Sequence, residues 1–353
     1  MKIIKIFLIN FLVFFTSILI IELIFGGWFK KDNFGAYFRE HRMKKVPYKI
    51  KYNGKIFEYV YKRNYHGFIG DELNPKDIKA VFIGGSTADE RWKPKEYSIA
   101  ELLNKKLKAD EIDVKIINSA IEGQSTVGYI ANFKYWYPKL EEFKPKYFIF
   151  YTGINELLKT NYDQWDFSDG MAKLVEKNKE KRLKDNLKSK SFFYDSLRKI
   201  KHKYYTRKKS VFMDLDQSYP PPKEISLKKY DYLKFNDAYK NKVKIDKLLI
   251  QNKKSLKGYL NNIDLLVDYS NSYSAKAIII NQVTAYGAYH DFHLSLNYAL
   301  NQHCEKMKYF CVDIASDFEG KEKYWYDWLH TTPLGSEEIS KSIYPKLKEH
   351  LSN

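Results

Sequence analysis

Five short apolar runs, rich in β-branched and aromatic residues, alternate with stretches of helical spacing, and this alternation most constrains the fold. The runs are residues 80–83, 114–117, 147–151, 277–283 and 309–314. Each run is continuous, as in strands that are covered on both faces. Strands that alternate with helices in this way form parallel sheets with right-handed crossovers. The sequence therefore predicts an α/β fold with a doubly wound, flavodoxin-like parallel five-stranded sheet.

Helices are expected between and after these runs. They cover residues 99–108, 127–143, 241–269 and 292–307. A final helix is expected to begin at Pro333 and to end near Leu351, because Thr332 suits the N-cap position and proline suits the first helical position.

Glycine and polar residues follow three of the runs, and a fourth polar block precedes the final helix. The blocks are Gly-Gly-Ser-Thr at 84–87, Glu-Gly-Gln at 122–124, Gly-Ile-Asn-Glu at 153–156 and Asp-Trp-Leu-His at 327–330. Loops that follow parallel strands meet at one edge of a sheet, where ligands bind. A serine, a glycine N–H, an asparagine amide and an Asp/His pair at that edge are the parts of a serine acyl-transfer site.

In their order and spacing, these four blocks resemble the SGNH hydrolase superfamily, also called GDSL-type esterases. The resemblance implies the SGNH hydrolase fold, with Ser86 as nucleophile and His330 as a general base that Asp327 orients. It also implies an oxyanion hole formed by the backbone N–H groups of Ser86 and Gly123 and by the side-chain amide of Asn155.

Simpler interpretations of the same residues were weighed against this one. Ser86 could be only a helix N-cap and Gly123 only a turn glycine, whereas the block that follows His330 is too close to the family pattern for a plain surface histidine. Glu156 replaces the usual Asp of the third block, at a position that we expect to support the loop rather than the chemistry. Gln282 could line the pocket. The histidines expected to be peripheral are His290, His293 and His303.

A long apolar segment precedes the α/β region. Residues 6–25 are long enough to span a bilayer, and the only acidic residue among them, Glu22, lies near one end, where it can reach the interface. A cleavable signal peptide would have a shorter apolar stretch and a small-x-small site, and no such site precedes Trp28. We therefore expect an uncleaved transmembrane anchor over residues 1–29.

The orientation of this anchor follows from two opposing arguments. Lys and Arg are more frequent just downstream of the apolar segment than upstream, and the positive-inside rule then favours a cytoplasmic body. Long domains, however, translocate largely regardless of charge. The resemblance implies a catalytic domain outside the membrane. We therefore expect a single-pass inner (cytoplasmic) membrane protein with a periplasmic or extracytoplasmic catalytic domain.

Two segments lie outside the strand–helix alternation. Residues 30–75 are expected to form a stalk and a β-hairpin, because residues 48–61 alternate apolar and polar side chains around Asn53-Gly54. Residues 157–239 are expected to form a helical insertion, either beside the site or as a solvated excursion without a catalytic part. The catalytic domain is then expected over residues 76–353.

Composition narrows the choice of partners. The formal net charge is +18, but Lys, Asn, Ile and Tyr are all plentiful, as an AT-rich genome produces without selection for a partner. Because no nucleic-acid-binding signature accompanies the charge, no nucleic acid is expected. Cys304 and Cys311 either form one disulfide in an oxidising compartment or are two small buried hydrophobes. No metal and no cofactor are expected.

These features together predict a serine-dependent ester hydrolase that works through an acyl-Ser86 intermediate. The resemblance and the expected location imply an O-acyl ester, above all O-acetyl, on a cell-surface glycan. Two alternatives stay open, an O-acyltransferase partnered with a membrane acyltransferase and a non-catalytic glycan-binding scaffold. The complete set of site residues argues against the scaffold.

Overall fold

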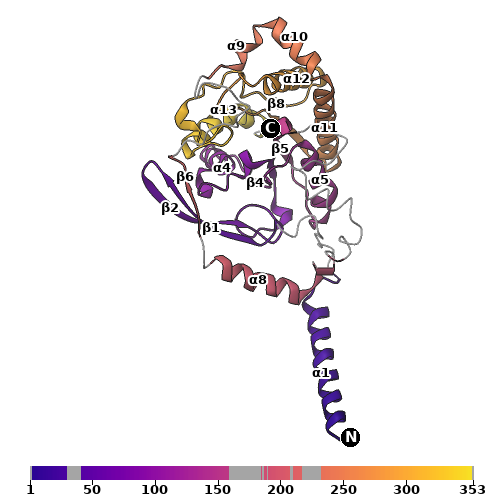
Figure 1. Ribbon diagram of the computed structural model, residues 1–353. Coiled ribbons are helices and arrows are strands. Elements are labelled where there is room, and N and C mark those ends of the chain that lie inside the picture. Colours follow the sequence, from indigo (N-terminus) through magenta and orange to yellow (C-terminus); the bar gives the residue numbers. More distant parts are fainter. Residues whose placement is uncertain are drawn as a thin grey trace.

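The computed structural model describes residues 2–29, 41–158, 184, 187–188, 190–206, 210–216 and 232–351. At its centre lies a five-stranded sheet of order β4-β3-β5-β7-β8, in which all neighbouring strands are parallel (Figure 1). Its strands are β3 (Ala80–Gly84), β4 (Ile116–Asn118), β5 (Tyr147–Tyr151), β7 (Lys276–Ile280) and β8 (Cys311–Val312). Counted along the chain, the second strand lies outside the first, so the predicted doubly wound, flavodoxin-like sheet is confirmed.

The last two strands are shorter than the apolar runs predicted. At their ends, hydrogen bonds to polar side chains replace the backbone hydrogen bonds between the strands. β7 ends at Ile280 and β8 at Val312. The side-chain oxygen of Asn281 then accepts hydrogen bonds from the backbone N–H groups of Ile314 and Ala315, at 2.8 and 3.1 Å. The backbone donors are therefore satisfied without further strand pairing.

Helices cover both faces of the sheet, and alternate strand residues supply two separate cores. On one face, Phe82 and Ile149 pack with the helices α4 (Ile99–Ala109) and α13 (Pro333–Leu351). On the other face, Val81 and Phe148 pack with α5 (Thr126–Tyr135), α11 (Lys253–Ser272) and α12 (Asp291–Met307). This two-sided burial explains why the strands are continuous apolar runs.

Two of the predicted helices end or divide at identifiable residues. The helix expected over 127–143 ends at Tyr135, and a 3-10 turn that contains Pro138, Tyr137–Lys139, follows it. The helix expected over 241–269 is divided at Asn252 into α10 (Lys242–Gln251) and α11. The final helix begins at Pro333 and ends at Leu351, as predicted.

A second, three-stranded sheet of order β2-β1-β6 lies beside the core (Figure 1). The strands β1 (Lys44–Tyr52) and β2 (Lys55–Arg63) form an antiparallel hairpin that begins before the predicted residue 48. At its turn, Asn53 and Gly54 have φ values of 50° and 69°, as a type I′ turn requires. Ile50 of β1 packs with Leu215 and Tyr326, which ties the hairpin to the loop of the fourth block.

The inserted segment is not purely helical, which corrects the prediction. Its described residues include the helices α8 (Phe192–Thr206) and α9 (Phe235–Tyr239) and the strand β6 (Val211–Asp214), which pairs in parallel with β1. The strand forms there because β1 offers a free edge to the β-prone sequence Val-Phe-Met. Some parts of the insertion and of the expected stalk lie outside the described residues, namely residues 30–40, 159–183, 185–186, 189, 207–209 and 217–231.

Two further features bear on location. Helix α1 (Lys2–Phe25) is long and apolar enough to cross a membrane, none of its most apolar window is buried, and it extends away from the body (Figure 1). Cys304 of α12 and Cys311 of β8 form a disulfide, so these cysteines are paired and are not two separate buried thiols.

Candidate active site

The serine block turns sharply at the end of β3. Ser86 begins α3 (Ser86–Asp89), and Glu90, the residue after this helix, has a left-handed backbone conformation (φ 49°). A Cβ atom at Gly85 would collide with the amide nitrogen of Asn155, so only glycine lets the loop after β5 approach the serine. Ser86 is the first residue of this short helix, and the tight turn fixes its position.

The serine, the histidine and the aspartate form one hydrogen-bonded chain. His330 Nε2 lies 2.8 Å from Ser86 Oγ, although the two residues are 244 positions apart. His330 Nδ1 lies 2.7 Å from Asp327 Oδ2. The backbone N–H groups of Leu329 and His330 donate to Asp327 Oδ1 at 2.7 and 2.6 Å. The fourth block therefore folds around its own carboxylate and presents the imidazole to Ser86.

Electrostatics keep this carboxylate ionised. Burial raises the pKa of Asp327, but the hydrogen bond and charge of His330, together with the two backbone N–H donors, outweigh it and hold the pKa below its usual value. An ionised Asp327 accepts the proton on Nδ1, which leaves Nε2 as the acceptor that faces Ser86. The ring of Tyr326 stacks on that of His330, with centroids 5.8 Å apart. The orientation of the imidazole is thus fixed on its edge and on its face.

Three N–H donors of the first three blocks have no hydrogen-bond partner among the described residues. The loop after β4 follows the end of β3, because Ile121 N–H donates to the Gly84 carbonyl at 3.1 Å, and Gly123 in this loop has a left-handed φ of 77°. Among the described residues, neither Ser86 N–H nor Gly123 N–H has a hydrogen-bond partner. One amide hydrogen of Asn155 is used by the Gln124 carbonyl at 2.7 Å, which leaves the second one open.

Two neighbouring residues hold the loop that carries Asn155. The Glu156 carboxylate accepts the Thr126 N–H at 2.6 Å at the start of α5, in the supporting role expected for this position. Gln282 is buried, and its side-chain oxygen accepts the Ile154 N–H at 2.7 Å while its nitrogen donates to Thr87 Oγ1 at 3.1 Å. Gln282 thus joins the first and third blocks, a role that the sequence did not reveal.

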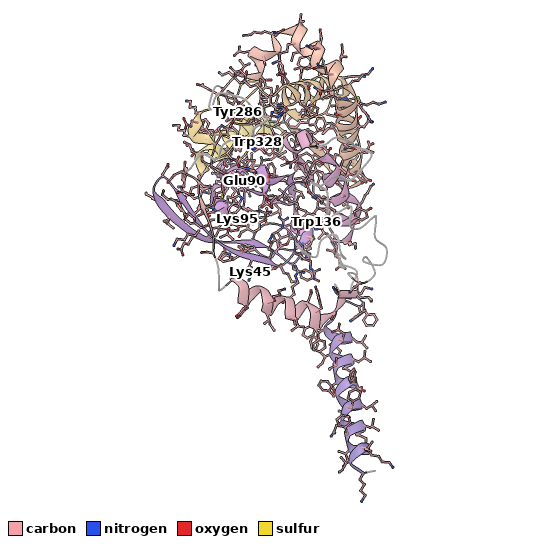
Figure 2. All side chains as sticks on the ribbon, in the orientation of Figure 1. Lys45, Glu90, Lys95, Trp136, Tyr286 and Trp328 are labelled. Atoms are coloured by element: carbon pink, nitrogen blue, oxygen red, sulfur yellow. A yellow bond between two sulfur atoms is a disulfide. The ribbon has the colours of Figure 1, made fainter. Side chains whose placement is uncertain are left out.

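The sequence also did not reveal a buried ion pair that contacts the segment after His330. Lys93 Nζ lies 2.8 Å from Glu90 Oε1, and both side chains are only 2% exposed. The same ammonium donates to the Thr331 carbonyl at 2.5 Å and to Ser336 Oγ at 2.6 Å. Figure 2 shows Glu90 near the middle of the body. The pair therefore ties the residue after His330 to the end of the serine turn.

The three histidines expected to be peripheral have other contacts. His303 Nε2 lies 2.6 Å from Asp264, and the His290 ring caps the start of α12 by accepting the His293 N–H at 3.3 Å. His293 is fully buried, and this burial together with His290 lowers its pKa to about 3. None of the three contacts Ser86, Asp327 or His330 in the described part of the chain.

The match to a protein family can now be set beside this geometry. The profile of the GDSL-like lipase/acylhydrolase family matches residues 80–343, which is well over half of the chain. The chain belongs to this family. It is accordingly an SGNH-type carboxylic ester hydrolase, and all four blocks lie within the matched region. A comparison with curated proteins gives no significant match.

Solved structures of low sequence identity resemble this GDSL acylhydrolase. TesA is 12% identical, with 77% of this chain and 98% of TesA covered and a TM-score of 0.42. The psychrotrophic esterase EstA from Pseudoalteromonas sp. is 14% identical, with 78% and 100% covered and a TM-score of 0.41. A mutant of Axe2, an acetyl-xylooligosaccharide esterase from Geobacillus, is 12% identical, with 76% and 94% covered and a TM-score of 0.42.

Proposed function

We propose that this acylhydrolase cleaves an ester through an acyl-Ser86 intermediate. The hydrogen-bonded chain from Ser86 through His330 to Asp327 carries the proposal. His330 takes the Ser86 proton as Oγ bonds to the ester carbonyl carbon, and it gives that proton to the departing alcohol. A water molecule then attacks the acyl-serine and passes its proton to His330. The carboxylic acid leaves, and Ser86 recovers its proton.

The negative charge that develops on the carbonyl oxygen is assigned to the three open donors. These are Ser86 N–H, Gly123 N–H and the second amide hydrogen of Asn155. They are held before substrate binds, so they need little reorganisation when the charge appears.

Loss of one of these donors gives a graded effect. Asn155→Ala is expected to lower kcat by about 10²- to 10³-fold with a small change in KM, because the amide acts on charge present only in the transition state. Steady-state kinetics on a chromogenic acetate ester measure this effect. The exposed Asn271→Ala in α11 is the control, with unchanged kinetics. If kcat of the Asn155→Ala enzyme is within about threefold of the wild-type kcat, Asn155 is not part of the oxyanion hole.

Substitution of the aspartate tests orientation rather than proton transfer. Asp327→Asn is expected to lower kcat by about 10³- to 10⁴-fold, because an amide that donates to Nδ1 places the proton on Nε2, where it can no longer accept from Ser86. Rates are measured for this variant and for Asp317→Asn. Asp317 lies outside the triad of Ser86, His330 and Asp327, so the Asp317→Asn enzyme should keep wild-type activity. Equal rates for both variants would contradict the assigned role of Asp327.

For the location, we propose that α1 is a membrane anchor and that the body is extracytoplasmic. The length and apolar character of α1 support the anchor. The Cys304–Cys311 disulfide supports an oxidising compartment, where such bonds persist. An anchored ester hydrolase in that compartment meets cell-surface glycans, so the proposed substrate is an O-acyl ester, above all O-acetyl, on such a glycan.

The substrate is tested with the full chain in detergent and an O-acetylated polysaccharide labelled in the acetyl group. Ser86-dependent release of labelled acetate supports the proposal. Label transferred to a second glycan would identify an O-acyltransferase, for which a membrane acyltransferase partner would then be sought. Cleavage of a simple acetate ester without action on any acetylated glycan would contradict the proposed glycan substrate but not the proposed ester hydrolysis.

A further inference from the structure

Helix α8 exposes a strip of large apolar and aromatic side chains. Phe193, Leu197, Ile200 and Tyr204 follow the spacing of one helix face. Their exposed fractions are, in that order, 37, 66, 65 and 55%. These four residues are called the α8 strip below. Lys201, which borders the strip, is also exposed. Water-facing helices seldom carry such a continuous strip, which indicates a nonpolar partner.

The other face of α8 is bound to the body. The Asp195 carboxylate lies 3.2 Å from the guanidinium of Arg42, which is 5% exposed and just precedes β1. Arg198 donates to the Arg42 carbonyl at 2.9 Å. In Figure 2 the labelled Lys45 of β1 lies just above α8. The α8 strip therefore points away from the body rather than into its core.

The start of α8 is fixed to the end of α1. The Glu22 carboxylate accepts the backbone N–H groups of Phe192 and Phe193 at 3.1 and 3.3 Å. Gly27 N–H donates to the Lys190 carbonyl at 2.7 Å. Glu22, the acidic residue within the apolar segment, thus caps another helix. In Figure 1, α8 lies across the end of α1 at a wide angle, between α1 and the body.

We propose that the α8 strip lies in the interfacial layer of the bilayer that α1 crosses. A helix that lies across the end of a spanning helix, with an apolar strip bordered by lysine, has the position and composition of an interfacial helix. Lysine at this depth favours anionic headgroups, so the partner is an anionic lipid surface. The body is then held at one height and orientation above the membrane. This inference rests on the proposed insertion of α1 and is independent of the ester chemistry.

Fluorescence quenching in lipid nanodiscs tests the proposal on the full chain. Single cysteines at Leu197, Ile200, Leu12 and Val243 carry an environment-sensitive fluorophore, since the native cysteines are paired in a disulfide. Leu12 reports on α1, and Val243 is a water-facing control in α10, 82% exposed and far from α1 in Figure 1. The discs contain phosphatidylcholine with or without phosphatidylglycerol. Quenchers are iodide in water and doxyl groups at shallow or deep positions in the lipid.

The fluorophores at 197 and 200 are expected to be quenched by shallow doxyl lipid, with a lipid-to-iodide quenching ratio at least about tenfold above that at 243. Phosphatidylglycerol should increase this ratio. If deep doxyl lipid quenches the fluorophore at 12 while iodide quenches those at 197 and 200 as it does the one at 243, the α8 proposal is wrong but the proposed membrane anchor is supported. Water-like quenching at 12 would overturn both. Labels at 197 and 200 that neither quencher reaches would indicate a protein cover and reject the lipid surface.

Discussion

Ser86→Ala is expected to lower kcat/KM for ester hydrolysis by about 10⁴- to 10⁶-fold and to abolish labelling by a fluorophosphonate probe. The expectation follows from the 2.8 Å contact between Ser86 Oγ and His330 Nε2, which no other hydroxyl in the described residues shares. Without Oγ there is no acyl acceptor. The residual rate comes from the oxyanion donors and substrate binding alone.

The measurement compares intact mass after probe treatment with turnover of an acetate ester, for the full chain in detergent. His330→Ala should lose turnover to a similar degree, because nucleophile and base act as a unit. Ser272→Ala, at an exposed serine near the end of α11, is the matched control and should label and turn over like wild type. Retained labelling in a folded Ser86→Ala protein would move the nucleophile elsewhere.

The sequence was sufficient for the parts of this fold that local pattern determines. Continuous apolar runs located all five strands of the central sheet, and Thr332-Pro333 located the start of α13. Asp327 and His330 were predictable as a pair because three residues of separation place both side chains on one loop, and the structure joins them at 2.7 Å.

What the sequence did not reveal depends on partners that are distant along the chain. A Glu and a Lys three residues apart, such as Glu90 and Lys93, usually indicate an exposed pair. They are buried here because Thr331 and Ser336, from the other end of the chain, complete their hydrogen bonds. Strand β6 likewise required the free edge of β1, and no local signal in either segment identifies the other.

The buried pair leads to the largest expected effect on stability. Lys93→Met is expected to lower the free energy of unfolding by about 3–5 kcal/mol, because it leaves the Glu90 carboxylate buried without a countercharge. Four groups lose the ammonium at once, namely Glu90 Oε1, the Thr331 carbonyl, Thr331 Oγ1 and Ser336 Oγ. Thermal unfolding of the full chain in detergent measures the loss.

Lys95→Met is the matched control for this substitution. Lys95 pairs with Glu101 at 2.8 Å, but its side chain is 46% exposed, so the loss should be below about 1 kcal/mol. The double variant Glu90→Gln with Lys93→Met should recover part of the stability, since a neutral amide needs no countercharge. Lys93→Met as stable as Lys95→Met would mean that water reaches Glu90 in the folded protein.

The same pair should matter for catalysis, because Thr331 directly follows His330. Loss of the ammonium releases the Thr331 carbonyl from the end of the serine turn, and the imidazole is then held to Ser86 only by its own loop. At a temperature where both variants are still folded, kcat of Lys93→Met and kcat of the double variant should therefore both fall below that of wild type, with KM nearly unchanged, because both lack this ammonium. An unchanged kcat would limit Lys93 to stability and leave the orientation of His330 to Asp327 and Tyr326.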